Sequence, residues 1–420
     1  MNNDISSIVE RLAAEARQAA RTLIRVDRAA VDNALLIAAQ ALDRKRDMLK
    51  TENAKDLEGA RSKGLSAAMI DRLTLSDKAL GSMIEGLRVV AKLDTPVGNI
   101  YDERIRPNGL RIYKRKVPIG VVAIIYESRP NVTVDAAAIC LKSQNAVILR
   151  GGSESFHSNL ALARLFADAL NEAGLPSAAV QLVPTTDRQA VDTLLTMDRF
   201  IDLVIPRGGE SLIRAVVEKS RIPVIKHYKG VCSIFVDDKA NVDLARRVCL
   251  NAKVQKPATC NALETLLVHR DVAPVFLPPM VDLFREHGVT VKGCRRVVEL
   301  IPDVEEASEQ AWYEEYLDLV VNIRIVDDMD QAIEHISTFG SEHTDAIITQ
   351  DYSRAWRFVR EVNSSLVLVN ASTRLNDGFQ LGLGAEMGIS TTKLHAFGPM
   401  GLEELTVNKF IAFGEGQVRG

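Results

Sequence analysis

The sequence lacks an excess of either charge, a long apolar run and an amino-terminal leader pattern. Its 420 residues carry 52 Lys and Arg against 55 Asp and Glu, a net charge of −3. This balance argues against a dedicated nucleic-acid binder, because binding through counterion release needs surplus positive charge. The longest apolar runs, such as VVAII, are too short to span a bilayer. The opening MNNDISSIVERL has no apolar segment after a basic cluster, so we expect no secretory signal and no membrane partner.

Cysteine is scarce and dispersed. The five cysteines are Cys140, Cys232, Cys249, Cys260 and Cys294. No C-x-x-C pair occurs, and no histidine stands at the spacing typical of zinc ligands, so we expect no metal site. An odd, scattered set in a chain of this size is typical of reduced thiols and predicts a cytoplasmic protein.

The chain is long enough to form two lobes, since 420 residues exceed what a single hydrophobic core usually holds. Residues 1–103 show apolar positions at helical spacing and are predicted to form amphipathic helices. From Val121, short apolar strands alternate with helical stretches, which predicts a parallel sheet covered on both faces. A second series begins at CSIFV. The boundary is therefore placed near Gly230, with a first lobe of 1–103 and 121–230 and a second of 231–395.

Residues 104–120 interrupt this alternation. A Pro107-Asn108-Gly109 turn stands between apolar residues, and Asn-Gly is the strongest short-range hairpin signal. A basic hairpin inserted in an α/β chain is more often an oligomer arm or a surface flap than a catalytic piece. The sequence therefore predicts a β-hairpin with one of those two roles.

Cys260 is the candidate nucleophile. It lies in QKPATCNALE, a polar turn between a predicted helix and a predicted strand, where a thiol can be partly exposed. A nearby ammonium such as Lys256 would stabilise the thiolate, which is the reactive form. The alternative is that Cys260 is a small hydrophobic residue filling space, and local context leaves both interpretations open.

Two glycine turns are candidate phosphate sites. Strand AVILR runs into Arg150–Ser153, and strand IDLVIP runs into Arg207–Ser211. Glycines at such a turn allow close approach of a ligand, the following helix favours phosphate, and an arginine there could meet a 2′-phosphate. A plain tight turn remains the alternative for either one.

Two further features are assigned structural roles. Gly382–Gly388 follows a loop and not a strand, so it fails the context test for a dinucleotide fingerprint and is expected to be a close-packed loop. None of the seven histidines fits a Ser-His-Asp arrangement. His227, in VIKHYKG, is expected to support the structure.

Taken together, five segments resemble the γ-glutamyl phosphate reductases, a family of the aldehyde dehydrogenase superfamily, over most of the chain. These segments are VPIGVVAIIYESRPNVTVDAAAICLKSQNAVILRGGSES, VIPRGGESLI, QKPATCNALETLLV, GSEHTDAIIT and NASTRLNDGFQLGLGAEMGISTTKLHAFGPMGLEELT. The resemblance implies an aldehyde-dehydrogenase-like α/β fold with a cofactor lobe, a catalytic lobe and a small β arm. The arm would comprise residues 104–120 and 396–420 and would build a homo-oligomer.

The implied reaction is the NADPH-dependent reduction of L-γ-glutamyl 5-phosphate to L-glutamate 5-semialdehyde and phosphate, on the route to proline. Cys260 would form a thioester, and the Asn131 side chain with the Cys260 backbone N–H would form the oxyanion hole. A transient contact with the glutamate kinase that supplies the labile acyl phosphate is left open.

The same resemblance implies two sets of binding residues. The cofactor would contact Arg150, Gly151, Gly152, Ser153, Glu154, Pro206, Arg207, Gly208, Gly209, Ser211 and Glu315. The anionic substrate would contact Arg129, Lys256, Asn370, Ser372, Thr373 and Arg374.

One absence and two departures from the family pattern qualify what the resemblance implies. The stretch VIKHYKGVCSIF carries no Glu where hydrolytic aldehyde dehydrogenases hold their base, which favours acyl transfer to phosphate. Leu375 replaces a usual Phe with little consequence for packing. Phe397 replaces a usual Arg and is expected to weaken substrate binding.

Two other functions remain open beside the implied reaction. The chain could be a non-phosphorylating or coenzyme A-acylating aldehyde dehydrogenase, or a catalytically silent nucleotide-binding member.

Overall fold

The computed structural model describes residues 5–419, which divide into two compact units. The first unit runs to Lys226 and takes in Leu383–Gly388 and the chain from Met400 onward. The second comprises His227–Gly382 and Ile389–Pro399. The boundary between the units lies between Lys226 and His227. The sequence predicted a boundary near Gly230. Residues 396–399, which the sequence grouped with the arm, lie in the second unit.

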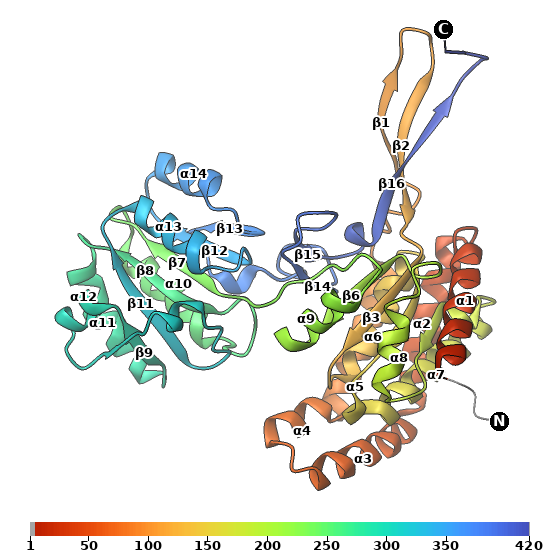
Figure 1. Cartoon of the computed structure of the whole chain (residues 1–420), viewed down its shortest axis with the longest axis horizontal. Coiled ribbons are helices and arrows are strands. Elements are labelled where there is room, and N and C mark those ends of the chain that lie inside the picture. Colours follow the sequence, from red (N-terminus) through yellow and green to blue (C-terminus); the bar gives the residue numbers. More distant parts are fainter. Residues whose placement is uncertain (1–4, 420) are drawn as a thin grey trace. The chain divides into compact units, whose positions relative to one another are not determined.

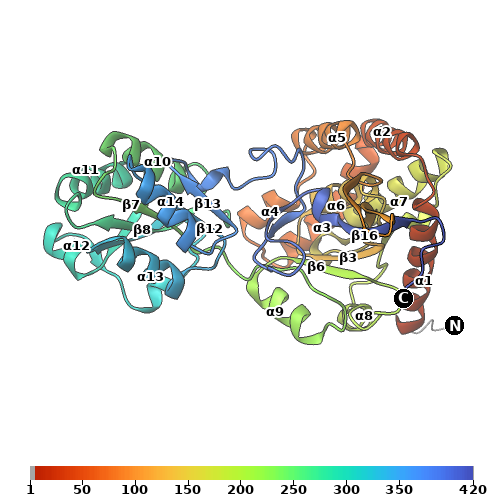
Figure 2. The ribbon, with the colours of Figure 1, turned by 90° about the horizontal axis from the view of Figure 1, so that it is seen from above.

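Amphipathic helices open the first unit. They are α1 (Ile5–Leu23), α2 (Arg28–Arg44), α3 (Arg46–Ser62), α4 (Ala67–Leu73) and α5 (Asp77–Lys92). Helix α1 buries Val9, Ala13 and Ala16 at helical spacing, and Asp27 caps α2 by accepting the Ala29 N–H. Figure 2 shows α2 beside α5, and the two helices pack together. The prediction of helices over residues 1–103 is confirmed for 5–92.

A four-stranded parallel sheet forms the body of the first unit (Figure 1). Its strands are β3 (Val121–Tyr126), β4 (Ala146–Arg150), β5 (Val180–Leu182) and β6 (Leu203–Arg207), in the order β5-β4-β3-β6. The helices between and after them are α6 (Pro130–Lys142), α7 (Phe156–Glu172), α8 (Arg188–Leu194) and α9 (Glu210–Lys219). All six β3 residues are buried, as expected of a parallel sheet covered on both faces. The strand order reverses at β3, with β4 on one side and β6 on the other.

The arm of the first unit is a three-stranded antiparallel sheet in the order β1-β2-β16 (Figure 1). Its strands are β1 (Ile100–Ile105), β2 (Arg111–Pro118) and β16 (Thr406–Phe413). The hairpin turn holds Gly109 at a φ of +84°, which glycine adopts without strain. The predicted hairpin is confirmed, and it begins at Ile100, before the expected 104, because β1 pairs back along β2 as far as Arg115.

The second unit is built on a seven-stranded parallel sheet in the order β10-β9-β11-β8-β7-β12-β13. The strands are β7 (Cys232–Val236), β8 (Leu263–His269), β9 (Thr290–Gly293), β10 (Glu305–Glu306), β11 (Val320–Val326), β12 (Thr344–Ile348) and β13 (Leu366–Val369). The helices are α10 (Val242–Val254), α11 (Ala273–Glu286), α12 (Arg295–Leu300), α13 (Met329–Phe339) and α14 (Tyr352–Glu361).

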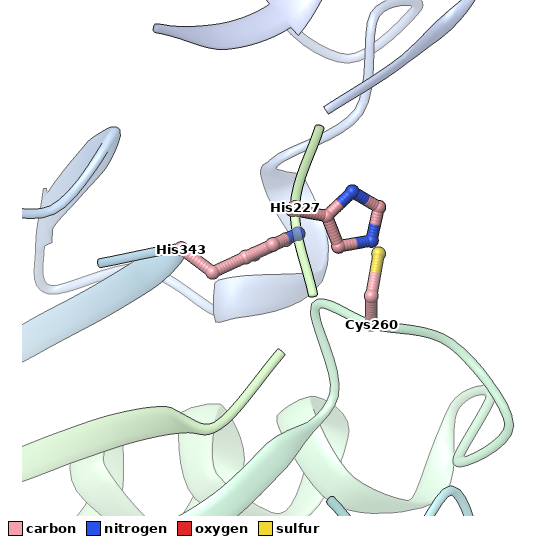
Figure 3. Close-up of side chains that lie close together, drawn as sticks. All are labelled: His227, Cys260 and His343. Atoms are coloured by element: carbon pink, nitrogen blue, oxygen red, sulfur yellow. The ribbon is translucent and has the colours of Figure 1, made fainter. Parts of the chain in front are cut away.

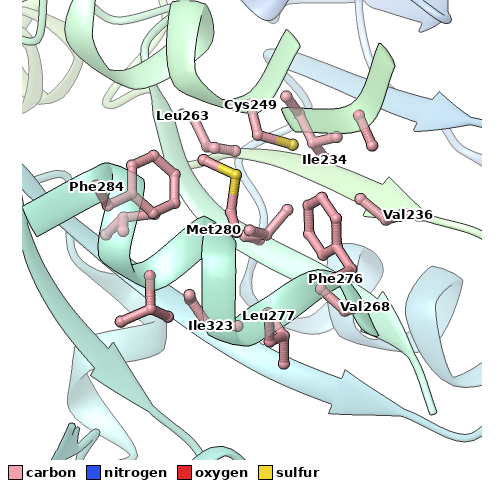
Figure 4. Packing of buried hydrophobic residues seen from close by; sticks show 14 of the residues in the cluster. Ile234, Val236, Cys249, Leu263, Val268, Phe276, Leu277, Met280, Phe284 and Ile323 are labelled. Atoms are coloured by element: carbon pink, nitrogen blue, oxygen red, sulfur yellow. The ribbon is translucent and has the colours of Figure 1, made fainter. Parts of the chain in front are cut away.

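Two apolar clusters cover the faces of this sheet. On one face, Phe276 and Met280 of α11 pack with Ile234 and Leu263 of the strands (Figure 4). On the other, Phe235 stacks on Phe358 of α14, with ring centroids 6.3 Å apart. Burial on both faces makes the sheet a rigid support for the loops at its edges.

Short elements complete the chain. They are β14 (Gly388–Ser390), β15 (Gly398–Met400) and the 3₁₀ turns Ser153–Ser155, Ser177–Ala179, Gln310–Tyr313, Thr373–Leu375 and Glu403–Leu405. Within residues 5–419, no helix combines the length and apolar character needed to cross a bilayer.

Candidate active site

Cys260 lies in the turn that joins α10 to β8. The turn is held by a hydrogen bond from Ala262 N–H to Thr259 O of 3.0 Å, and by one from Asn261 Nδ2 to Asn376 O of 2.9 Å. The Cys260 side chain is half-buried. The predicted setting, a partly exposed thiol in a polar turn between helix and strand, is confirmed.

The backbone of Gly230 packs directly on this turn. A Cβ added at Gly230 would lie 1.9 Å from the carbonyl oxygen of Cys260 and 2.9 Å from its Cα. No side chain fits at that distance, so glycine is needed here for close approach of two backbones. The thiol of buried Cys232 donates to the same Cys260 carbonyl at 3.2 Å. The two contacts fix the peptide that carries the thiol.

Two histidines lie beside Cys260 (Figure 3). One ring nitrogen of His227, one of His343 and the Cys260 Sγ all lie within 4.8 Å of one another. The three residues precede β7, β12 and β8, which are neighbours in the sheet. Because these strands are parallel, their amino ends meet at one edge. The sheet order therefore gathers residues that are distant in the sequence.

His343 is buried and neutral. Burial, with a smaller contribution from the neighbouring His227, lowers its pKa to about 3. Its Nδ1 lies 2.7 Å from Thr344 Oγ1, whereas its buried Nε2 has no hydrogen-bond partner. The two histidine rings meet edge to face, with centroids 5.4 Å apart.

The other thiols have different surroundings. Burial raises the pKa of the Cys140, Cys249 and Cys232 thiols, which disfavours their thiolates. Cys294 is half-buried, like Cys260, but it follows the carboxyl end of β9 at the opposite edge of the sheet. Cys260 is thus the half-buried thiol at the amino edge.

Arg374 is brought to the Cys260 turn. Its Nη1 donates to Asn261 Oδ1, and its Nε donates to Gln255 Oε1 at 2.9 Å. Burial lowers the pKa of Arg374, and the charges of Asp377, Cys260 and Cys232 act in the opposite direction. The guanidinium still carries its positive charge at neutral pH, and such a charge stabilises a neighbouring thiolate.

The other predicted substrate residues of this unit do not all lie in one place. Lys256 is exposed in the same turn as Cys260. Ser372 Oγ accepts the Arg374 N–H at 3.3 Å, and the buried Thr373 Oγ1 has no hydrogen-bond partner. The Asn370 amide bonds both the N–H and the C=O of Thr349, at 3.0 and 2.8 Å, after the carboxyl ends of β12 and β13. The structure therefore does not group Asn370 with Cys260.

Phe397 and Leu375 mark the two departures from the family pattern. Phe397 is 37% exposed, and the Lys393 Nζ lies 5.7 Å from the centre of its ring. A cation therefore lies close to Phe397, where the resemblance leads us to expect an arginine. Leu375 is 38% exposed at the end of a 3₁₀ turn, where a change of apolar side chain costs little.

Glu315 is tied to the loop that contacts Cys260. Its Oε1 accepts the Gly230 N–H at 2.9 Å, and the nearby Lys229 Nζ donates to Tyr313 O at 2.7 Å. The predicted cofactor residue of the second unit thus braces the backbone on which the Cys260 carbonyl packs.

The two Arg-Gly-Gly turns of the first unit lie at the carboxyl ends of β4 and β6, the strands on either side of β3. Arg150 donates to Gly151 O at 2.6 Å and to Thr186 O at 2.9 Å, and its buried Nε has no hydrogen-bond partner. Burial lowers the pKa of Arg150 without removing its charge. The strand order reverses between these turns, and ligands of open α/β sheets bind at such a reversal.

In the turn after β4, the backbone leaves no room for side chains. A Cβ at Gly151 would lie 2.1 Å from the Asn159 amide nitrogen. One at Gly152 would lie 2.7 Å from the Glu154 carboxylate, which also accepts hydrogen bonds from Ser153 and Ser128. The turn is therefore closely packed by Asn159 and Glu154.

In the turn after β6, a carboxylate meets the start of a helix. The Gly209 N–H donates to Glu127 Oε2 at 3.1 Å, and Gly208 packs on the same side chain. Pro206 is buried in β6, and Ser211 is exposed in the first turn of α9. This helix start accommodates an anionic group.

The segment Gly382–Gly388 is a loop that is closely packed at Gly384 and leads into β14 at Gly388, whereas Gly382 is exposed. A Cβ at Gly384 would lie 2.3 Å from Leu93, and one at Gly388 would lie 2.2 Å from the Arg207 guanidinium. Gly388 therefore packs on a predicted cofactor residue without being part of a fingerprint.

The remaining predicted residues begin α6 in the first unit. Arg129 is the residue before the helix and is exposed, and Asn131 lies in its first turn. The Asn131 Nδ2 donates to Asp135 Oδ2 at 3.1 Å.

Comparison with known proteins agrees with this architecture. The model of the aldehyde dehydrogenase family matches residues 4–295. The γ-glutamyl phosphate reductases of Geotalea daltonii and Geobacter metallireducens are each 54% identical over 99% of both chains. The crystal structure of γ-glutamyl phosphate reductase from Thermotoga maritima matches with a TM-score of 0.96 and 43% identity, over 98% of this chain and 100% of that one. The chain therefore belongs to the γ-glutamyl phosphate reductases of the aldehyde dehydrogenase family.

Proposed function

We propose that this chain is an oxidoreductase that reduces L-γ-glutamyl 5-phosphate to L-glutamate 5-semialdehyde and phosphate, with NADPH as the hydride donor, in proline biosynthesis. The observation that carries the proposal is the half-buried Cys260 thiol beside the Arg374 cation and the His227 ring. The full-length relatives at 54% identity support the substrate. All five cysteines are free thiols, which suits a reaction in the cytoplasm.

The first step belongs to Cys260. The thiol loses its proton to a nearby base, and the His227 ring nitrogen, within 4.8 Å of the Sγ, is placed to take it. The thiolate then attacks the acyl carbon of the acyl phosphate. A carbon–sulfur bond forms, the carbon–oxygen bond to phosphate breaks, and phosphate leaves with the electron pair.

Negative charge develops on the acyl oxygen in this step. We assign its stabilisation to the Cys260 backbone N–H and the Asn131 side chain, an amide of the type that forms oxyanion holes. Gly230 packs on the Cα and carbonyl of Cys260, and Cys232 donates to that carbonyl, so the residue that carries this N–H is held in place. Fixed donors stabilise a developing charge without the cost of reorientation.

The residues of the first unit fit a phosphorylated dinucleotide. Two glycine turns, the start of α9 and the side chains of Arg150 and Arg207 lie where the order of β4, β3 and β6 reverses. Arg150 has a buried Nε–H without a protein partner, and arginine beside such a turn suits the 2′-phosphate that distinguishes NADPH. When bound, the nicotinamide supplies the hydride that reduces the thioester to the aldehyde.

The loop before β7 argues against hydrolysis. It carries His227 and Gly230, and no glutamate stands there to activate water. An enzyme that returns its acyl group to phosphate benefits from the absence of such a base. A coenzyme A-acylating or water-using enzyme is the second candidate, and the acceptor dependence of the reaction separates the two.

The test is the reverse reaction, NADP⁺ reduction by glutamate 5-semialdehyde, followed by absorbance with and without phosphate. The proposal predicts absorbance growth that requires phosphate, is lost in Cys260→Ala and persists in Cys294→Ala. Absorbance growth without phosphate, or only with coenzyme A, would show that the acyl acceptor is water or coenzyme A and not phosphate. Growth with NAD⁺ and not NADP⁺ would contradict the cofactor.

We also propose that the arm joins two copies of the chain. Ile105, Phe410 and Phe413 are 65, 66 and 64% exposed on β1 and β16, the outer strands of the arm. Exposed apolar side chains on an edge strand are typical of a surface covered by another strand. A second copy fits because each strand can pair with its own equivalent.

The association is tested by light scattering. Phe410→Glu combined with Phe413→Glu is expected to reduce the mass to that of one chain, because two charges would be buried in the contact. Val275→Glu, a change at a 65% exposed apolar residue on α11 of the second unit, is the control and should leave the mass unchanged. A wild-type chain that is monomeric would contradict the proposal.

A further inference from the structure

We propose that Cys260, His227 and His343 together form a binding site for a thiophilic divalent cation, Zn²⁺ or its spectroscopic substitute Co²⁺, and that the bound cation holds the enzyme inactive. The binding follows from the donor set alone. The inactivation rests on the proposed role of Cys260 as nucleophile.

The donor set matches the preference of Zn²⁺. One thiolate and two imidazoles are common zinc ligands, and three protein ligands leave the fourth position of a tetrahedral ion open. The donor atoms lie within 4.8 Å of one another. Zn–S and Zn–N bonds of about 2.3 and 2.0 Å require separations of roughly 3.5 Å, so the side chains need to close by only about 1 Å. Cys260 and His227 are half-buried and can make that adjustment.

His343 supplies the second and independent observation. Its Nε2 is buried, and it has no hydrogen-bond partner in the protein. A buried polar atom without a partner costs free energy, which a ligand at that atom would recover. Figure 3 shows the ring of His343 pointing toward that of His227, which in turn lies against the sulfur of Cys260.

The surroundings of His343 prepare it to ligate. With a proton on Nδ1 donated to Thr344 Oγ1 at 2.7 Å, the lone pair of Nε2 is available. Ligating histidines usually have such an outer partner, which fixes the tautomer and the orientation of the ring. Thr344 Oγ1 is itself held by Asn376 Nδ2 at 2.6 Å.

One nearby charge limits the affinity. The Arg374 guanidinium interacts with Cys260 and repels a second cation, whereas the thiolate attracts it. We therefore infer reversible binding that a chelator removes, in contrast to a structural zinc site. While the sulfur is bound to metal, its lone pair is not available to attack an acyl phosphate.

The test is a titration of the reduced, full-length protein with Co²⁺ in the absence of substrate, followed by its absorption spectrum. We expect one equivalent to give a thiolate-to-cobalt charge-transfer band, and Zn²⁺ to abolish that band. Cys260→Ser should lose the band. His227→Ala and His343→Gln should each weaken binding by at least about tenfold, because even the loss of an outer partner of a ligand costs that much. His227 is half-buried, so its variant keeps the test valid if His343→Gln does not fold.

Cys294→Ser is the matched control, since Cys294 is the other half-buried thiol, and it should keep the band. A band lost in Cys294→Ser, an affinity unchanged in His227→Ala, or no band at all would overturn the site. Zn²⁺ should also abolish turnover, and EDTA should restore it. Failure of the catalytic proposal would leave the spectra unaffected, whereas failure of the metal site would leave turnover insensitive to Zn²⁺.

Discussion

In the four-stranded sheet of the first unit, all the candidate cofactor residues except Glu315 lie at or just after the carboxyl ends of β4 and β6. In the seven-stranded sheet of the second unit, Cys260, His227 and His343 precede the amino ends of β8, β7 and β12. Both sheets are parallel and covered on both faces, yet they present their chemistry at opposite edges.

The difference follows from what each edge offers. A carboxyl edge leads into helix starts, whose N–H groups and partial positive charge suit phosphates. At an amino edge, the chain arrives from the carboxyl end of a helix. That end carries a partial negative charge, which does not favour a thiolate. At that edge a side chain must provide the positive charge, and Arg374 does so. The comparison therefore predicts that changes at the two edges have separable effects.

The largest expected effect comes from Cys260→Ala. Without the nucleophile no thioester forms, and turnover should fall by roughly a thousandfold or more, as in other enzymes that lose their nucleophile. NADP⁺ binding, measured by calorimetry, should change little, because every predicted cofactor residue except Glu315 lies in the first unit. Retained turnover in this variant would remove Cys260 from the mechanism.

Gly230→Ala should come next. The added methyl would sit 1.9 Å from the Cys260 carbonyl, so the backbone must shift, at a cost of about 1–3 kcal/mol in stability. The melting temperature and turnover should both fall. Gly209→Ala is the matched variant at the other edge, where the nearest atom would be 3.9 Å away, and its melting temperature should hardly change. If the melting temperature fell equally in both variants, the close packing of Gly230 on Cys260 would not explain the effect.

Arg150→Met tests the carboxyl edge. Removing the guanidinium should raise the KM for NADPH by roughly tenfold or more, since a charge-assisted contact is lost, with a smaller change in kcat. The KM for NADH, which has no 2′-phosphate, should change less. The rate of Cys260 alkylation should stay at the wild-type value. A fall in that rate would show that the two edges are not separable in this way.

Arg374→Met is the smallest and most local change. Its positive charge favours the thiolate, so its removal should raise the pKa of Cys260 and shift the pH profile of alkylation to higher pH. At neutral pH the alkylation rate should fall several-fold, while NADP⁺ affinity stays constant. Arg374→Lys should recover part of the rate. An unshifted profile would mean that another group stabilises the thiolate.

Local sequence patterns predicted much of the fold. Apolar runs marked the strands, Pro107-Asn108-Gly109 marked the hairpin turn, and the polar neighbours of Cys260 marked a half-buried thiol. These are properties of short segments. The sequence also showed that Gly382–Gly388 is not a dinucleotide-binding fingerprint, because no strand precedes it.

The grouping around Cys260 could not be predicted in that way. His227 and His343 join Cys260 only because β7 lies between β8 and β12, and strand order is set by packing over the whole unit. The expectation of no metal site rested on local spacing, which is blind to such a grouping. One signal was present: HYKG, PATCN and SEHTD each stand just before an apolar strand of the same series.

Asn370 illustrates a different limit of local sequence patterns. It shares the NASTR segment with Arg374, yet its amide bonds the Thr349 backbone, whereas Arg374 reaches the Cys260 turn. Asn370 also has a φ of +56°, which asparagine tolerates in a turn. Neighbours in a motif can thus serve the fold and the site separately.

The central claim is that Cys260 carries the acyl group. The most direct measurement is to mix the protein with glutamate 5-semialdehyde and NADP⁺ without phosphate, quench in acid within milliseconds, and map the modified peptide by mass spectrometry. The account predicts a glutamyl thioester on the peptide containing Cys260, which disappears when phosphate is present. An adduct on Cys294, or turnover with no covalent adduct at any thiol, would contradict it.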